Sequence, residues 1–473
     1  MATWTCKFWV KITALTCKFF GVSMGPKANS PQSQDLFRAE LMEQINLKHP
    51  LVKLAQLIEW EKIDAICAHH FPSQRGRPAI SSRLIAGLLY LQHAFDLSDE
   101  DVVWAWVENP YWQVFTGETY FQTEPPIDPS SLTRWRKRLG IEGVEALLAA
   151  SISAGKRAGA VRSNSMKTVI VDTTVMPKAV AYPTDSRLLE RSRQYLVKVA
   201  GRLGLKLRQN YNREAPRLVL QVGRYAHAKQ FKRMNKALRA LRSRVGRIWR
   251  ELNRQKDLVT GSARQHLDGL LALTQRILTQ KRQDKHKLYA LHGPEVECIS
   301  KGKTRTPYEF GVKVSITTTL KEGFVLGACA MPGNPYDGHT LAPALAQAHR
   351  LSQAAIHTAV VDKGYKGATA EGVRILRSGQ RRGITRGLKA KIKRRSAIEP
   401  TIGHMKSDGK LNRNWLKGQL GDALHAILCG AGHNIRQLLR HLRHFLALIW
   451  VWVLGLGLLK VSPIPDSQLN FGD

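Results

Sequence analysis

Residues 168–174 read Thr-Val-Ile-Val-Asp-Thr-Thr, and this stretch decides the fold that we expect. Its apolar run, residues 169–171, is typical of a strand buried in a sheet, and we predict one over residues 168–175. Asp172 ends the run with a charge, which is costly to bury unless it is paired or bound to a metal. The carboxylate is then either held rigidly at the carboxyl end of a strand or caps a turn, which is the commoner role of a lone strand-end Asp.

A second apolar run ends in the same way. Ala359-Val-Val is followed by Asp362 and then by Lys-Gly-Tyr-Lys-Gly, residues 363–367. Glycines at such a position let the backbone turn sharply and approach a ligand. Asp362 is therefore a second candidate for a carboxylate at the end of a strand, here residues 358–361, and a turn role is open for it too.

A third acid lies in Arg395-Ser-Ala-Ile-Glu-Pro-Thr-Ile-Gly-His-Met-Lys406. On a helix, the offsets from Arg395 to Glu399 and on to Lys406 place all three residues on one face. Pro400 fits the first turn of such a helix. This face presents a carboxylate that can bind a metal between two cations that can bind a phosphate. Alternatively, the three side chains form a ladder of salt bridges along the helix.

Together, two carboxylates from strand ends and one from a helix can clamp a pair of divalent metal ions, the arrangement that phosphodiester chemistry needs. Oxygen ligands favour Mg²⁺ or Mn²⁺. Two more acids compete for a role. Asp337 is expected to cap the helix that follows it, and Asp185 is expected in a loop where it can reach DNA or the metals.

The charge of the chain points to a polyanionic partner. Of its 473 residues, 73 are Lys or Arg and 36 are Asp or Glu, which gives a formal net charge of +37. A field of one sign on this scale opposes folding unless a polyanion is near, and nucleic acid is the first candidate. A ribosome-like or membrane-surface protein is the alternative.

The cysteines and the apolar segments exclude other classes. None of the six cysteines forms a Cys-x-x-Cys pair, so a zinc finger is not expected, and their scatter fits reduced thiols in the cytosol. Residues 3–24 mix aromatic side chains with lysines and make a poor signal peptide, and Met24 is an alternative start. Residues 445–459 are apolar but shorter than the ~20 residues of a membrane span, so we expect a carboxyl-terminal helix and no membrane partner.

We expect four regions: an uncertain extension over residues 1–30, a helical DNA-binding domain over 31–150, a catalytic domain over 160–442 and an apolar tail over 443–473. In the helical domain, Ser130-Ser131 caps a basic, aromatic helix that follows a turn, as a DNA-reading helix would, although a solvated helix face is equally compatible. The cations of this helix are Arg134, Arg136, Lys137 and Arg138.

The catalytic domain is predicted to be α/β, with a ribonuclease-H-like mixed sheet. After the first strand we expect a basic helical insertion over residues 186–292, which forms an arm against the sheet or another subunit and whose basic face contacts phosphates. Strands over 310–319 and 324–331 follow, then a helix over 340–351, the strand over 358–361 and a short helix near 370–376.

The chain resembles the DDE transposases of bacterial insertion sequences, in the broad group of the insertion-sequence-four and insertion-sequence-five families. That group carries a Tyr-x2-Arg-x3-Glu-x6-Lys signature, which the chain matches at Arg395, Glu399 and Lys406, with Ile392 in place of Tyr. The resemblance covers most of residues 35–442. Further stretches that carry it are Gly76-Arg-Pro78, residues 83–91, Asn109-Pro-Tyr-Trp-Gln-Val-Phe-Thr-Gly117, residues 134–138, Asn334-Pro-Tyr-Asp-Gly-His-Thr-Leu341 and Val361-Asp-Lys-Gly-Tyr365.

The resemblance implies an enzyme that binds the terminal inverted repeats of its element and cleaves DNA. It implies that Asp172, Asp362 and Glu399 hold two Mg²⁺ or Mn²⁺ ions and are catalytic, and that a DNA 3′-hydroxyl then attacks the target in a strand-transfer step. The cations expected at the DNA phosphates are Arg395, Lys406 and Lys363. The partners implied are double-stranded DNA, at the element ends and the target, and further copies of the chain in a homodimer or larger assembly.

Two other functions remain open from the sequence. A DNA-binding regulator, or an inactive relic of a transposase, fits the charge and the helical domain equally well. A host nuclease of ribonuclease-H type that cuts RNA–DNA hybrids fits the acids, but it needs neither the insertion nor the amino-terminal helices.

Overall fold

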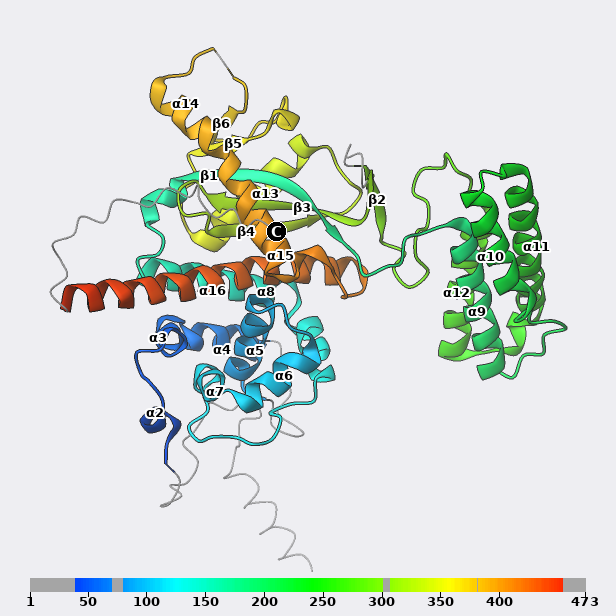
Figure 1. Cartoon of the computed structure of the whole chain (residues 1–473), viewed down its shortest axis with the longest axis horizontal. Helices are drawn as coiled ribbons and strands as arrows, with labels where there is room; N and C mark the ends of the chain where they lie inside the picture. Colours follow the sequence, from blue (N-terminus) through cyan, green and yellow to red (C-terminus); the bar gives the residue numbers. More distant parts are fainter. Residues whose placement is uncertain (1–38, 70–79, 301–306, 381, 454–473) are drawn as a thin grey trace, which may run out of the picture.

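One mixed sheet organises the protein, whose computed structural model describes residues 39–69, 80–300, 307–380 and 382–453 (Figure 1). The described strands are β1 (Thr168–Pro177), β2 (Glu297–Ser300), β3 (Tyr308–Thr319), β4 (Val325–Met331), β5 (Thr358–Val361) and β6 (Arg374–Arg377). The predicted extension over 1–30, the stretch Gly76-Arg-Pro78 and the tail beyond 453 lie outside the described residues.

The strand order confirms the ribonuclease-H-like fold. The strands run β4-β3-β1-β5-β6 across the sheet, with β2 pairing the outer edge of β3 beside β4. β1, β3 and β4 are antiparallel neighbours, whereas β5 and β6 run parallel to β1. The order expected from the sequence was a strand, a helical insertion, two strands, a helix and a further strand, and β1, β3, β4, α13 (Asp337–Ser352) and β5 follow this order.

Two local predictions were wrong. The short helix expected near 370–376 is β6, because these residues complete the parallel edge of the sheet with Leu376 opposite Val360 and buried. β1 does not end at 175 but continues to Pro177, so Asp172 lies within the strand, opposite Ile316. Thr173 and Thr174 are β-branched and extend the strand past the charge.

The amino-terminal helices share one hydrophobic core with the sheet. Buried residues of α5 and α8 belong to the same cluster as Val169 of β1 and Leu341 of α13. The helices of this part are α2 (Leu41–Gln44), α3 (Pro50–Leu57), α4 (Trp60–His69), α5 (Ser82–Ala94), α6 (Asp99–Glu108), α7 (Pro110–Thr116) and α8 (Ser130–Arg157). α8 kinks at Gly140, where φ is 60°, and continues towards β1.

Sequence signals set several of these helix ends. Ser98 and Asp101 form a capping box at the start of α6, and Asn109 accepts a hydrogen bond from the Trp112 N–H at the start of α7. Gly117 ends α7 in the left-handed conformation that glycine adopts without strain. The cap predicted at Ser130-Ser131 was wrong, because α8 begins at Ser130 itself, with Pro129 at its N-cap and no side-chain cap hydrogen bond.

The insertion between β1 and β2 is a four-helix body with a core of its own (Figure 1). Its helices are α9 (Asp185–Arg202), α10 (Glu214–His227), α11 (Phe231–Gln255) and α12 (Gly261–Thr279). At its base, the buried Lys178 pairs with Glu295 at 2.8 Å and Asp422 at 2.6 Å. These ion pairs join the end of β1, the return of the insertion and the carboxyl-terminal helix.

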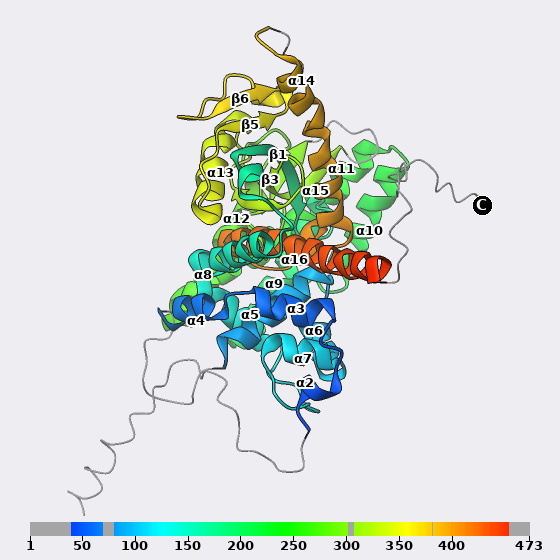
Figure 2. The same cartoon turned by 90° about the vertical axis from the view of Figure 1, so that its left-hand side faces the viewer.

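The chain closes with two helices beside the sheet and one beneath it: α14 (Arg386–Lys393), α15 (Ile398–Ser407) and α16 (Gly418–Val453). α16 and α8 lie together between the sheet and the amino-terminal helices (Figure 2). Among the described residues, no helix is both long and apolar enough to cross a membrane.

Substitution of a glycine in β3 tests the pairing of β3 with β1. A Cβ built at Gly311 would lie 2.0 Å from the Met176 carbonyl oxygen of β1, so the strands would have to separate. Gly311→Ala should therefore lower the free energy of unfolding by about 2–3 kcal/mol. In the matched control Gly269→Ala, on exposed α12 with open space around it, helix propensity should add up to about 1 kcal/mol. Thermal melts that rank the two variants the other way would contradict this register.

Candidate active site

The three acids meet around one guanidinium. β1 and β5 pair in parallel with Ile170 opposite Val360, so Asp172 and Asp362 follow two residues later at the same level of the sheet. Arg395 lies 3.3 Å from Asp172, 3.9 Å from Asp362 and 2.7 Å from Glu399, with a different nitrogen facing each carboxylate. Residues that are far apart in the chain thus form one cluster, as the sequence pattern predicted.

The three carboxylates differ in exposure. The side chain of Asp172 is 20% exposed, that of Asp362 47% and that of Glu399 61%. Burial raises the pKa of Asp172, and the nearby charges of Asp362 and Asp337 raise it further, against the lowering effect of the Thr173 N–H and Arg395. The pKa of Asp172 therefore lies above the ordinary value of an aspartate.

A fourth carboxylate stands beside the cluster. Asp337 accepts hydrogen bonds at 3.0 Å from the Thr173 hydroxyl and from Lys313. The expectation that Asp337 caps a helix was wrong, because α13 has Tyr336 at its N-cap and no side chain caps it. The sequence analysis also missed Thr173 and Lys313. Thr173 directly follows Asp172, whereas nothing in the sequence around Lys313 indicated a contact with an acid.

The predicted phosphate-binding cations lie on or next to the elements that carry the acids. Lys363 is exposed and directly follows Asp362 at the end of β5. Lys406 is half-buried in the last turn of α15, the helix that carries Glu399 near its start. Arg395 contacts the acids themselves, so in this structure its charge offsets theirs.

The cluster around Arg395 has more negative than positive charge, which favours the binding of metal ions. Three carboxylates face a single guanidinium, and the fourth, Asp337, is matched by Lys313 at 3.0 Å. Two negative charges of the cluster are thus left over, and Asp172 is held among them in a mostly buried position. An oxygen donor set with this excess fits divalent cations such as Mg²⁺ or Mn²⁺.

One of the four cations predicted to bind DNA from α8 is buried. Arg134, Lys137 and Arg138 on α8 are exposed. Arg136 is 3% exposed and donates hydrogen bonds to Asp99 and to Gln92. Arg136 is therefore an anchor between α8 and the neighbouring helices and not part of a DNA-binding face, because sequence spacing alone does not show which side of a helix is buried.

Comparison with known proteins identifies this class of site. Residues 39–138 match the family described as transposase domain (DUF772), and residues 275–435 match the family described as transposase DDE domain. The second range includes Asp362 and Glu399, whereas Asp172 lies outside both ranges. The fold and the matches define a DDE transposase.

One relative covers part of the chain. The uncharacterized protein ORF8 of the nfe locus of Rhizobium meliloti is 50% identical over 208 residues, which are 44% of this chain and 100% of that protein. No solved structure matches the chain. The chain belongs to the DDE transposases of insertion-sequence type, and its place among the insertion-sequence superfamilies stays a prediction.

The raised pKa of Asp172 predicts a dependence of stability on pH. A carboxyl whose folded pKa lies above its unfolded value costs stability as pH rises through the interval between the two values. Asp172→Asn removes this cost, so the variant should melt at a higher temperature than the parent protein near pH 7 in EDTA, and the difference should shrink as pH falls below the unfolded pKa. Added Mg²⁺ should raise the melting temperature of the parent more than that of the variant.

Proposed function

We propose that the protein cleaves DNA at the terminal inverted repeats of its own element and joins the freed 3′ ends to target DNA, with divalent metal ions bound at Asp172, Asp362 and Glu399. The observation that carries this proposal is the excess of negative charge around Arg395. Three carboxylates from three different elements face one cation. Such a set suits metal ions that bind phosphate oxygens better than it suits a purely structural ion-pair cluster.

Each residue has a distinct part in the proposed reaction. Mg²⁺ or Mn²⁺ held by Asp172, Asp362 and Glu399 would activate the attacking oxygen and stabilise charge at the scissile phosphate. Asp172, fixed within β1, and Asp362, at the end of β5, set the spacing of the ligands because their strands are hydrogen-bonded neighbours. Glu399 approaches from α15, and it is the most exposed of the three, so it can adjust when DNA enters.

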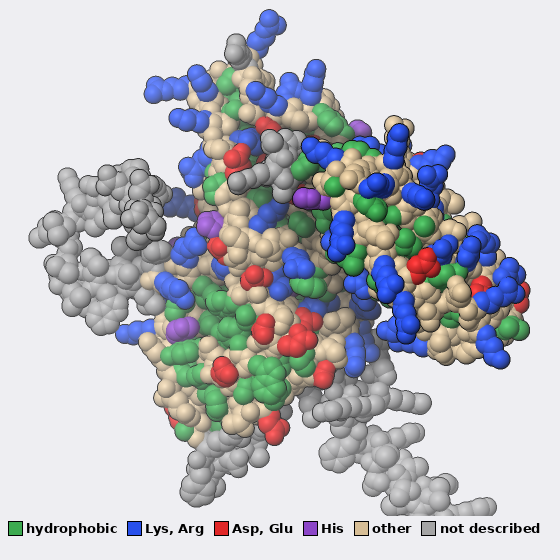
Figure 3. Space-filling view, turned by 45° about the vertical axis from the view of Figure 1, so that its right-hand side comes forward, with side chains coloured by type: hydrophobic (Ala, Val, Ile, Leu, Met, Phe, Trp, Pro, Cys, Tyr) green, Lys and Arg blue, Asp and Glu red, His purple; other side chains and the backbone are tan. Residues whose placement is uncertain are grey.

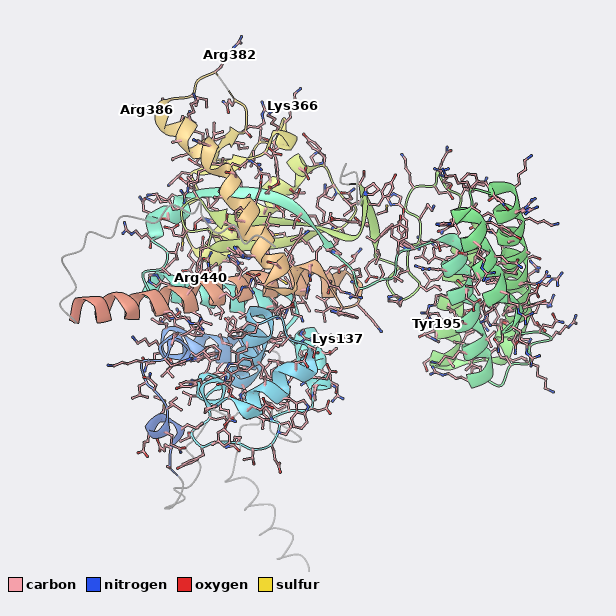
Figure 4. The ribbon with its side chains drawn as sticks, viewed as in Figure 1. Lys137, Tyr195, Lys366, Arg382, Arg386 and Arg440 are labelled. Atoms are coloured by element: carbon pink, nitrogen blue, oxygen red, sulfur yellow. The ribbon has the colours of Figure 1, made fainter. Side chains whose placement is uncertain are left out.

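Positive charge around the cluster supports a DNA substrate. Lys363 and Lys406 are placed to bind phosphates that flank the cleaved bond, and Arg395 orients the acids and can reach the same phosphate. Figure 4 shows Lys366, Arg382 and Arg386 extending outward at the end of the molecule that carries α14. These cations form a positively charged surface along which the DNA backbone can bind.

Recognition of the element ends is assigned to the amino-terminal helices. Arg134, Lys137 and Arg138 share the exposed side of α8, and Figure 4 shows Lys137 at the surface of this part, well apart from Arg382 and Arg386. Two separated basic surfaces suit a protein that reads one segment of DNA and cuts another. Two element ends need two active sites, so we also propose that the protein acts as a homodimer or larger assembly.

A cleavage assay tests the proposed function. Duplex DNA that carries the element ends is incubated with the full chain in Mg²⁺, Mn²⁺ or EDTA. Cleavage should need the metal, and Asp362→Asn or Glu399→Gln should reduce its rate by at least about a hundredfold, because metal-ligand carboxylates act in the transition state. The control Glu371→Gln, at an exposed acid of the loop before β6, should cut at the parent rate.

Binding measured on the same DNA separates the alternatives. Undiminished cleavage by Asp362→Asn would contradict the assignment of the site. Specific binding of the ends without cleavage under any metal would instead identify a regulator or an inactive relic. Preferential cutting of an RNA–DNA hybrid would identify a nuclease of ribonuclease-H type.

A further inference from the structure

The insertion carries a row of cations on its longest helix. The buried residues of α11, among them Leu241, Val245 and Leu252, recur every three or four positions and pack into the four-helix core. Because an α-helix has 3.6 residues per turn, the opposite face recurs at the same interval. Six exposed residues of that face form what we call the basic stripe: Lys232, Lys236, Arg239, Arg247, Arg250 and Arg254.

The basic stripe is not used to hold the insertion together. The acids of this body pair with other arginines: Glu214 with Arg244, and Glu251 with Arg208. Within the part of the chain that the structure describes, no stripe residue forms an ion pair, and Arg247 only donates a hydrogen bond to the Tyr211 hydroxyl. Like charges at successive turns repel, so the stripe destabilises the free helix and would gain most from a polyanion.

An exposed aromatic side chain lies at one end of the stripe. Phe231 begins α11, next to Lys232, and is 57% exposed. Lys229, in the turn from α10, is exposed beside it. Proteins that bind nucleic acids commonly combine an exposed aromatic side chain with nearby cations, because the ring packs on sugars or bases while the cations bind phosphates.

The dimensions of the stripe match a DNA duplex. From Lys232 to Arg254 the helix rises by about 33 Å, and one turn of duplex DNA is about 34 Å long. Figure 3 shows Lys and Arg side chains spread over this body with few acids among them. α11 lies at the edge of the insertion farthest from the sheet in Figure 1, and its stripe is opposite the face that packs on the other helices.

We propose that the basic stripe and Phe231 bind the backbone of duplex DNA, without regard to sequence, at a segment distinct from the one held at the three carboxylates. This inference rests on the proposed function, since it assumes that DNA is the substrate. Lysines and arginines that contact only phosphates position DNA but do not read it. The insertion then serves as an arm that grips DNA away from the cleavage point, such as target DNA or the DNA held by a second copy of the chain.

The salt dependence of binding tests this inference. The full chain is titrated with end-containing duplex and with unrelated duplex over a range of salt concentrations. The triple variant Lys232→Gln/Lys236→Gln/Arg239→Gln should weaken binding to both duplexes by the same factor, on the order of tenfold to a hundredfold at low salt. The slope of log K against log salt should become shallower by about 2.7, because each lost phosphate contact removes about 0.9.

A matched control removes the same charge from another helix of the same body. Arg191→Gln/Lys198→Gln/Arg202→Gln alters exposed cations of α9 and should leave the slope within about one unit of the parent. Phe231→Ala should weaken binding with little change in slope, since it removes no charge. An equal loss in the α9 control would overturn the assignment to the stripe, because net charge alone would explain the effect.

The remaining outcomes are decisive as well. If the stripe variant binds and cuts DNA like the parent, the inference fails while the proposed function stands. If the stripe variant changes only the oligomeric state in sedimentation, the stripe is an interface between copies and the inference also fails. If the parent protein binds no DNA at any salt concentration, the proposed function itself is wrong.

Discussion

Repulsion among carboxylates is the constraint on which this structure depends. Asp172, Asp362 and Glu399 lie within 4.0 Å of one guanidinium, and Asp337 stands beside them. Such a cluster persists only if the surrounding structure holds it. The parallel pairing of β1 with β5 fixes two of the acids, the core under α15 fixes the third, and Arg395 offsets part of their charge. In the proposed function, the repulsion that lowers stability at this site is what allows it to bind cations.

The attachment of the insertion also has to keep the active-site strand in place. A large basic body leaves the end of β1 and returns before β2, so its attachment must keep the strand carrying Asp172 in place. The buried ion pairs of Lys178 with Glu295 and Asp422 do this, because they join the exit, the return and α16 in one desolvated cluster. Removal of one partner from such a cluster is costly, since it leaves a buried charge unpaired. The base of the insertion is therefore held to the end of β1 and to α16.

Much of this arrangement was readable in the sequence. The apolar runs before Asp172 and Asp362 predicted two strands, and the order of strands and helices predicted the ribonuclease-H-like fold that the strand pairing confirms. The roles of Asp172, Asp362 and Glu399 remain predictions that the geometry supports. Asp337 was interpreted as a helix cap because sequence shows local hydrogen-bond options, whereas its partners Thr173 and Lys313 come from strands far along the chain.

Other features could not be predicted for physical reasons. β6 looked helical because four residues of an edge strand carry too little periodicity to tell a strand from a helix. Arg136 looked like its exposed neighbours because its burial depends on Asp99 and Gln92 of other helices. The shared core of the amino-terminal helices and the sheet was likewise invisible, since the contacts of α16 with both are long-range.

Direct measurement of metal binding tests the central claim most closely. Mn²⁺ is titrated into the full chain bound to a duplex that carries an element end, and free Mn²⁺ is followed by electron paramagnetic resonance. The parent protein should bind Mn²⁺ at a site that Mg²⁺ competes for, and Asp362→Asn should lose this binding while it still holds the DNA. Equal Mn²⁺ binding by the parent, Asp362→Asn and Glu399→Gln would contradict the claim that these carboxylates form a metal site.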